Sequence, residues 1–231
     1  MVKLDKAVGS AAYKVLLTRR TETKPTVRLK TMPATIPDCD GVFSKFFDHW
    51  YDDDDRQRKV FSHTRPDMMA AYRTGLSGSD ICPLSEASRQ RVLDQIATML
   101  KTAHSDWSAY LPVSGEIDMD WVEVSDSYYD TERIAELISA SDPEDFLNEF
   151  VVTVCQFGAV LGHVMRQSEP RLVWVAEWPY WESGLYDPAT GNIIPPFHWA
   201  MKKFSDYGVD DGYVPKIGCM IHILNNPDEK P

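Results

Sequence analysis

The sequence predicts an α+β protein, in which a helical N-terminal half is joined to a long buried helix that backs a small antiparallel sheet of three or four strands. Two observations support this prediction. Apolar residues recur at helical spacing in several stretches before Pro170, and beyond Pro170 the period changes from helical to two. The 231 residues are 43% hydrophobic and 26% charged, which is typical of a folded globular chain and argues against disorder.

The charge of the chain is unevenly distributed. Residues 1–30 carry a net charge of +6, whereas the whole chain carries −11 at pH 7, so the remainder sums to −17. Prolines at positions 25, 33 and 37 resist helix and sheet alike, so residues 1–39 are expected to form a basic, weakly structured arm. Residues 40–231 are expected to form one globular unit with a strongly acidic surface.

Within that unit, residues 40–140 are predicted to be mainly helical. One amphipathic helix is expected to begin at Asp40, and its apolar positions are Val42, Phe43, Phe46, Phe47 and Trp50. A short helix should follow Pro66, and a longer one should begin near "PLSEAS" with Val92, Leu93, Ile96, Met99, Leu100 and Ala103 in one stripe. The segment "GEIDMDWVEV" alternates like an edge strand, and residues 130–139 look helical again.

Residues 141–226 are predicted to form a helix-plus-sheet module, followed by a mobile tail over 227–231. "SDPEDF" predicts a helix start with Asp142 as the cap, and Phe146, Phe150, Val154, Phe157 and Leu161 then define a largely buried face. On this helix Gly158 and Gly162 would let another element approach closely.

The expected strands begin with residues 172–178, an inner strand that carries Trp174 and Trp178 on one face. "YDPATGN" should then turn the chain between strands at 184–186 and 193–194. A helix with Phe197, Ala200, Met201 and Phe204 on one face follows, and residues 217–224 alternate like a last strand.

The segments "FGAVLGHVM", "RLVWVAEW" and "GLYDPATGNIIPPFHWAMKKFSDYG" resemble the C-terminal module of certain uncharacterised bacterial proteins. The resemblance covers about residues 150–210 and consists of packing residues. It implies a bacterial cytosolic protein with an α+β module, and it implies no catalytic residues.

Motifs for catalysis, cofactors or nucleic acid are missing from the sequence. It has no P-loop, no G-x-G-x-x-G, no H-E-x-x-H and no C-x-x-C pair, so no cofactor is expected. The four separated cysteines favour a reducing cytoplasm, and no apolar run reaches the roughly 20 residues of a membrane span. The acidic body should repel nucleic acid and attract a basic protein.

Two surfaces are therefore predicted to bind a partner protein. One is acidic and comprises Asp48, Asp52, Asp53, Asp54 and Asp55. The alternative for these aspartates is a solvated helix end, because consecutive positions on a helix point about 100° apart and cannot converge on one metal ion. The other surface is aromatic and comprises Trp181, Tyr186 and Trp199, which could equally belong to the core.

The preferred function is a non-catalytic acidic protein that binds another protein, such as an inhibitor or an immunity-type antidote. A first alternative is a hydrolase or metal-dependent enzyme with an acid/base or metal site drawn from Glu177, Glu182, His198 and His222. A second alternative is a module that binds a small ligand in a pocket lined by tryptophans. The sequence does not decide between them.

Overall fold

The computed structural model describes residues 36–50, 85–176, 180–205 and 212–226. The chain divides into two compact units, residues 1–34 and 35–231, and everything described below belongs to the second. Most of the predicted basic arm, the short helix after Pro66, the aspartates at 52–55, Glu177 and the tail at 227–231 lie outside the described residues.

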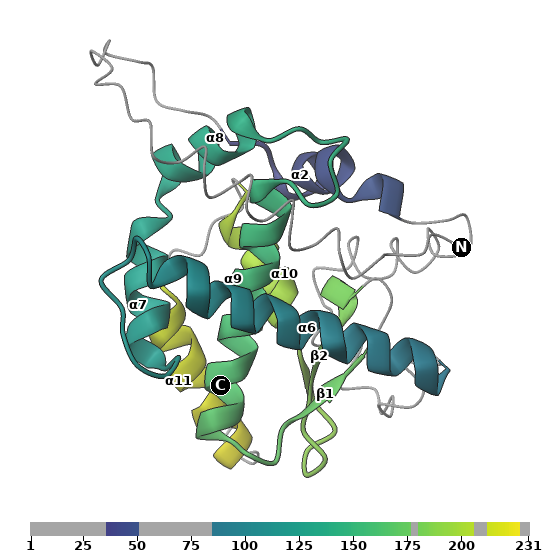
Figure 1. Ribbon diagram of the computed structural model, residues 1–231. Coiled ribbons are helices and arrows are strands. Elements are labelled where there is room, and N and C mark those ends of the chain that lie inside the picture. Colours follow the sequence, from purple (N-terminus) through teal and green to yellow (C-terminus); the bar gives the residue numbers. More distant parts are fainter. Residues whose placement is uncertain (1–35, 51–84, 177–179, 206–211, 227–231) are drawn as a thin grey trace. The chain divides into compact units, whose positions relative to one another are not determined.

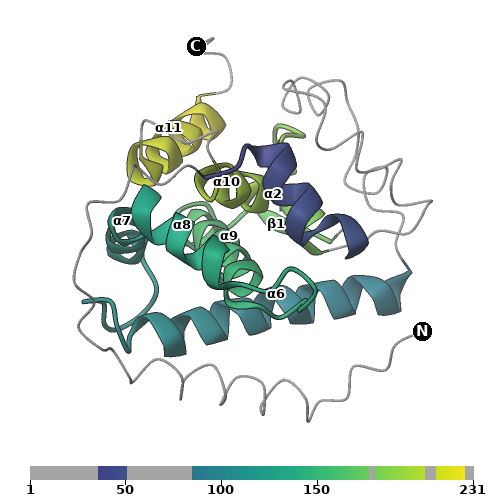
Figure 2. The same ribbon diagram turned by 90° about the horizontal axis from the view of Figure 1, so that it is seen from above.

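Helix α9 (Glu149–Ser168) is the centre of the core. Its side chains are buried on nearly every face from Phe150 to Met165. Figure 2 shows α9 between α6 (Glu86–Trp107) on one side and α10 (Pro196–Lys203) on the other. A helix that is apolar all round is stable in water only when other elements enclose it, as they do here.

The two glycines of α9 allow the close packing that the sequence predicts. A Cβ atom at Gly158 would lie 2.3 Å from Cδ1 of Phe197 on α10, and one at Gly162 would lie 2.4 Å from the Trp174 ring. The same helix therefore contacts α10 through one glycine and the sheet through the other.

The sheet has three antiparallel strands in the order β1 (Val173–Val175), β2 (Gly184–Tyr186) and β3 (Ile193–Ile194). Trp174 pairs with Leu185, and Leu185 pairs with Ile194 (Figure 1). The predicted turn at "YDPATGN" joins β2 to β3, and the Asp187 amide donates to the Asn192 carbonyl at its base. The α+β class and a sheet of three strands are thus confirmed.

Local capping residues set the starts of the other helices. Helix α2 (Cys39–Phe46) begins after Asp38, whose carboxylate accepts the Gly41 amide at 2.6 Å, two residues earlier than the predicted cap. It leads into the short 3₁₀ helix η1 (Asp48–Trp50). Helix α6 is capped by Ser85 and α8 (Thr131–Ala140) by Asp130, and both begin where the sequence predicts a helix. A second 3₁₀ turn, η2, covers Tyr180–Glu182.

Two predicted strands are helices. In place of an edge strand, α7 (Met119–Tyr128) begins after Asp118, whose carboxylate accepts the amides of Asp120 and Trp121. In place of the last strand, α11 (Tyr213–Asn225) buries Tyr213, Ile217 and Leu224, which share one helical face. Both predictions were wrong because alternation over a few residues also fits a helix with one buried face.

The start of α9 was also predicted wrongly. Asn148 is the cap in place of Asp142, and its Oδ1 accepts the Val151 amide at 2.8 Å. Residues 141–148 form successive turns ahead of the helix. Phe146 therefore does not share the buried face of α9 that Phe150 occupies.

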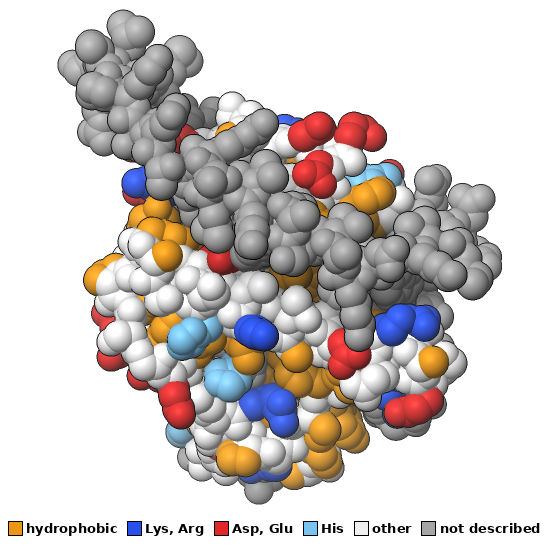
Figure 3. Space-filling view, in the orientation of Figure 1, with side chains coloured by type: hydrophobic (Ala, Val, Ile, Leu, Met, Phe, Trp, Pro, Cys, Tyr) orange, Lys and Arg blue, Asp and Glu red, His pale blue; other side chains and the backbone are white. Residues whose placement is uncertain are grey.

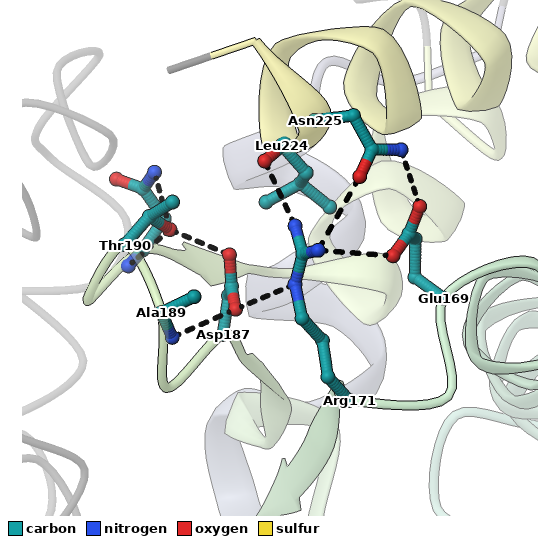
Figure 4. Close-up of polar contacts among 8 residues, drawn as sticks. Glu169, Arg171, Asp187, Ala189, Thr190, Leu224 and Asn225 are labelled. Carbon is teal, nitrogen blue, oxygen red and sulfur yellow. Dashed lines mark hydrogen bonds and ion pairs between the residues drawn. The ribbon is translucent and has the colours of Figure 1, made fainter.

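An ion pair between the partly exposed Arg171 and the buried Asp187 connects the β2–β3 turn to the end of α11 (Figure 4). Arg171 Nε donates to Asp187 Oδ1 at 3.0 Å, and its Nη2 donates to the Leu224 carbonyl at 2.8 Å. Asp187 is fully buried and also accepts the Ala189 amide and the Thr190 hydroxyl. With its charge and acceptors satisfied in this way, Asp187 has a structural role.

Among the residues that the structure describes, no helix is both long and apolar enough to cross a bilayer.

Candidate partner-binding surface

The predicted acidic surface is described only in part. Asp48 lies in η1 and is half-buried, whereas Asp52, Asp53, Asp54 and Asp55 lie outside the described residues. Their part in partner binding therefore stays a prediction.

The expectation of an exposed aromatic cluster is wrong for two of its three members. Trp181 is 1% exposed and Trp199 is 8% exposed, while Tyr186 is half-buried in β2. Trp181 packs against Phe47, with ring centroids 4.9 Å apart. The ring of Trp199 is covered by the Lys216 ammonium at 4.2 Å from its centroid. Burial of these large rings stabilises the core, so the core interpretation applies to them.

The structure instead exposes a different aromatic side chain. Phe146 is 50% exposed, and Val173 at 48% is the other large hydrophobic side chain exposed in the described part of the chain. A single exposed apolar residue is ordinary on a protein surface. Phe146 stands out because of the rigid turn that carries it and the side chains around it.

Asn148 holds that turn in place. Its Nδ2 donates to the carbonyls of Asp142 at 3.0 Å and Asp145 at 2.7 Å, while its Oδ1 caps α9. The Asp142 carboxylate accepts the Glu144 amide, and the Asp145 carboxylate accepts the Leu147 amide, both at 3.0 Å. These contacts fix the backbone on both sides of Phe146, so little conformational entropy remains to be lost there on binding.

Phe146 packs against a series of aromatic rings that leads into the core. Its ring centroid lies 4.6 Å from that of His49, and the two rings are tilted. Its ring also meets that of Trp50 edge-to-face, with centroids 5.3 Å apart. Trp50 in turn packs edge-on against Trp181 at 4.4 Å. Trp181 was predicted to contact a partner, but it is one of the buried rings on which the exposed one rests.

Carboxylates border the exposed ring. Asp142, Glu144 and Asp145 are all exposed, and they lie within four residues of Phe146. Figure 3 shows acidic side chains gathered at the top of the face in view, beside a hydrophobic and a histidine side chain. We call this region the Phe146 surface and define it by Phe146, His49, Trp50, Asp142, Glu144 and Asp145.

The predicted acid/base site is only partly described. His198 is half-buried on α10, and His222 is exposed on α11, where its Nδ1 accepts a hydrogen bond from Asn226 Nδ2 at 3.1 Å. Glu177 lies outside the described residues, and Glu182 is described only as the last residue of η2. Within the described ranges, no three histidine, cysteine or acidic side chains are grouped so that they could hold a metal ion.

The buried titratable groups are poorly suited to catalysis. Burial raises the pKa of the Cys155 thiol to about 12, although its hydrogen bond with Tyr180 lowers that pKa slightly. Burial likewise raises the pKa of Tyr180 well above its ordinary value. Both groups are neutral at physiological pH and shielded from water, so neither can act as a nucleophile or a general base.

A ligand pocket lined by tryptophans finds little support in the described residues. Trp107, Trp121 and Trp181 are almost fully buried, and each packs against other aromatic rings. Their faces are thus occupied by side chains of the core.

The segment before α9 contains one local signal of the Phe146 surface. In "SDPEDFLN" the two aspartates and Asn148 can each accept a nearby backbone amide, which favours successive turns over a helix. The proximity of His49 and Trp50 to Phe146 left no local signal, because about a hundred residues separate them in the chain.

Comparison of the sequence with protein-family models gave no match, and comparisons with curated proteins and with solved structures gave none either. The resemblance to bacterial C-terminal modules stays a prediction.

Proposed function

We propose that this protein is a non-catalytic binding protein that recognises a second protein with a basic surface, in the manner of an inhibitor or an antidote. The observation that carries the proposal is Phe146, an exposed aromatic ring on a fixed turn with three exposed carboxylates beside it. The described cysteines Cys39, Cys155 and Cys219 are free thiols, which suits the reducing cytoplasm in which we propose that it acts.

Protein interfaces commonly combine these two features. Their binding energy is concentrated in a few anchors, often aromatic, that enter a pocket of the partner, and a polar rim surrounds the anchor. Carboxylates around Phe146 would pair with lysine or arginine side chains and exclude acidic competitors. A partner with a basic pocket therefore fits this surface in both shape and charge.

The net charge of the chain supports the same partner. At −11 the protein attracts basic molecules over a distance of about 10 Å at moderate salt, which speeds their encounter. The predicted contributors Asp52 to Asp55 add four negative charges to the chain and stay part of the proposal on that ground.

The experiment is affinity capture of the partner from an extract of the source organism, followed by measurement of its Kd with purified variants. Phe146→Ala should weaken binding at least tenfold, which corresponds to about 1.4 kcal/mol. The matched control is Val173→Ala, which removes an equally exposed apolar side chain from β1.

The charge contribution is tested with Asp142→Asn, Glu144→Gln and Asp145→Asn combined. Asparagine keeps the oxygen that accepts the backbone amide at 142 and 145, so the turn is retained while the charge is removed. This variant should bind more weakly and with a shallower dependence on salt. Equal affinity of wild type, the charge variant and Phe146→Ala, or the absence of any retained partner, would contradict the proposal.

A further inference from the structure

A second surface collects positive charge on this acidic protein. Lys101 and His104 lie three residues apart on α6, and His163 and Arg166 lie three apart on α9, so each pair shares one side of its helix. These two helices pack against each other. Figure 3 shows histidine and basic side chains near one another in the lower part of the face in view. We call Lys101, His104, His163 and Arg166 the α6–α9 basic group.

The loop at Gly115 and Glu116 lies near the imidazoles of both His104 and His163. His104 Nε2 lies 2.9 Å from the Gly115 carbonyl, and because a carbonyl can only accept, Nε2 carries the proton. The next residue, Glu116, raises the pKa of His163, while burial and Arg166 lower it and outweigh the effect of Glu116. The loop at 115–116 is thus close to both rings.

Two contacts hold the α6–α9 basic group in position, but few hydrogen-bond acceptors face it. The His104 ring stacks on Trp121 with centroids 5.1 Å apart, and Arg166 Nε donates to the Leu172 carbonyl at 3.2 Å. Among the described residues, Lys101 and Arg166 form no ion pair, and His163 accepts or donates no hydrogen bond, although the chain has 35 acidic residues.

Positive groups placed close together raise each other's free energy unless an anion neutralises them. Glu116 supplies one negative charge near His163, whereas the group contains both an ammonium and a guanidinium, so positive charge is in excess. A tetrahedral oxyanion offers several acceptor oxygens, and a guanidinium with an ammonium is a common way to bind one.

We propose that the α6–α9 basic group binds the phosphate group of a small molecule. Arg166 and Lys101 would supply the fixed charges, and His163 would donate a hydrogen bond to a phosphate oxygen. His104, whose Nε2 donates to the Gly115 carbonyl, would donate to the phosphate from Nδ1 when its ring carries a second proton. The site is separate from the Phe146 surface and does not depend on the proposed protein partner.

The test follows the imidazole proton signals of His104 and His163 by NMR during titration with inorganic phosphate. Both signals should shift in a saturable manner, and the exposed double variant Lys101→Gln/Arg166→Gln should bind at least tenfold more weakly. The control Arg89→Gln removes an exposed cation from the same helix α6 and should bind like wild type. Unshifted imidazole signals, or equal binding by the double variant, would overturn the proposal.

Sulfate serves as a second probe, because its charge stays constant between about pH 6 and pH 8 while imidazoles titrate. Its affinity should rise as the pH falls towards 6, because burial and Arg166 lower the pKa of His163 below its ordinary value and this ring gains its proton only at the acidic end of the range; an unchanged affinity would contradict the contribution of His163. Glycerol 3-phosphate and vesicles with phosphatidic acid then distinguish a soluble ligand from a lipid headgroup, and failure of both would overturn a phosphate ester as the natural ligand.

Discussion

Phe146 and Phe150 lie four residues apart, in two regions of the molecule that differ in nearly every physical respect. Phe150 belongs to α9, where it is fully buried and packs against Phe46 with ring centroids 4.4 Å apart. Phe146 belongs to a turn outside the helix and exposes half of its surface. The boundary between the regions is Asn148, whose side chain caps α9 and holds the turn at the same time.

This difference shows how one short segment can supply both a buried core ring and an exposed ring on a fixed turn. Burial of α9 stabilises the fold, and the fold in turn fixes the turn from which Phe146 projects. An exposed aromatic ring costs little stability when it is removed, so stability alone does not account for it. The comparison can be tested directly by substitutions on each side of Asn148.

The largest expected effect is the loss of the buried ring. Phe150→Ala should lower the free energy of unfolding by about 4 kcal/mol, because it removes a fully buried ring and leaves a cavity. Phe146→Ala should lower it by less than about 1 kcal/mol, the contribution of its stacking on His49 and Trp50. Urea denaturation of both variants measures this difference, and similar losses would show that the two rings are equally buried in solution.

A second pair of variants tests how tightly α9 is packed. Gly158→Ala should cost about 2 kcal/mol, because the new Cβ would overlap the Phe197 ring and approach its Cα to 3.0 Å. Gly218→Ala on α11 meets no atom within 4 Å and should stabilise the protein by about 0.5 to 1 kcal/mol through helix propensity. The two changes in melting temperature should therefore have opposite signs; a stabilised Gly158→Ala variant would contradict the close contact between α9 and α10.

A third effect, of similar size, concerns the ion pair between Arg171 and Asp187. Asp187→Asn should cost roughly 2 kcal/mol, because Arg171 loses the charge opposite Nε while a third of its side chain stays in contact with water. Asp94→Asn, an exposed change on α6, should alter stability by less than about 0.5 kcal/mol. Chemical denaturation of both variants at neutral pH provides the comparison, and an Asp187 variant as stable as its control would show that the pair contributes nothing.

Much of the fold could be predicted because local signals were strong. Ser85 and Asp130 each accept an amide at the start of a helix, and the turn after Tyr186 consists of residues that favour turns. The strands predicted over 116–121 and 217–224 failed because alternating apolar residues in so short a window do not exclude a helix that buries one face. Burial by α9 and α7 decided in favour of a helix for α11, and that packing cannot be seen in a short window of sequence.

The surfaces were harder to predict than the fold. Composition and charge predicted a binding protein with a surface of aspartates. Phe146, whose ring is exposed, was predicted to lie inside a helix. Trp181 was predicted to contact a partner, yet its neighbours Phe47 and Trp50 come from a distant part of the chain and bury it. The α6–α9 basic group likewise joins residues about sixty positions apart.

The central claim, that Phe146 contacts a partner protein, is tested most directly by photo-crosslinking. The photoreactive residue p-benzoylphenylalanine is placed at position 146 and, in a separate variant, at position 173, where Val173 is similarly exposed on β1. Position 146 should crosslink to one basic protein, with a yield that falls as salt rises, and position 173 should give no crosslink. Equal crosslinking from both positions, or none from position 146, would contradict the claim.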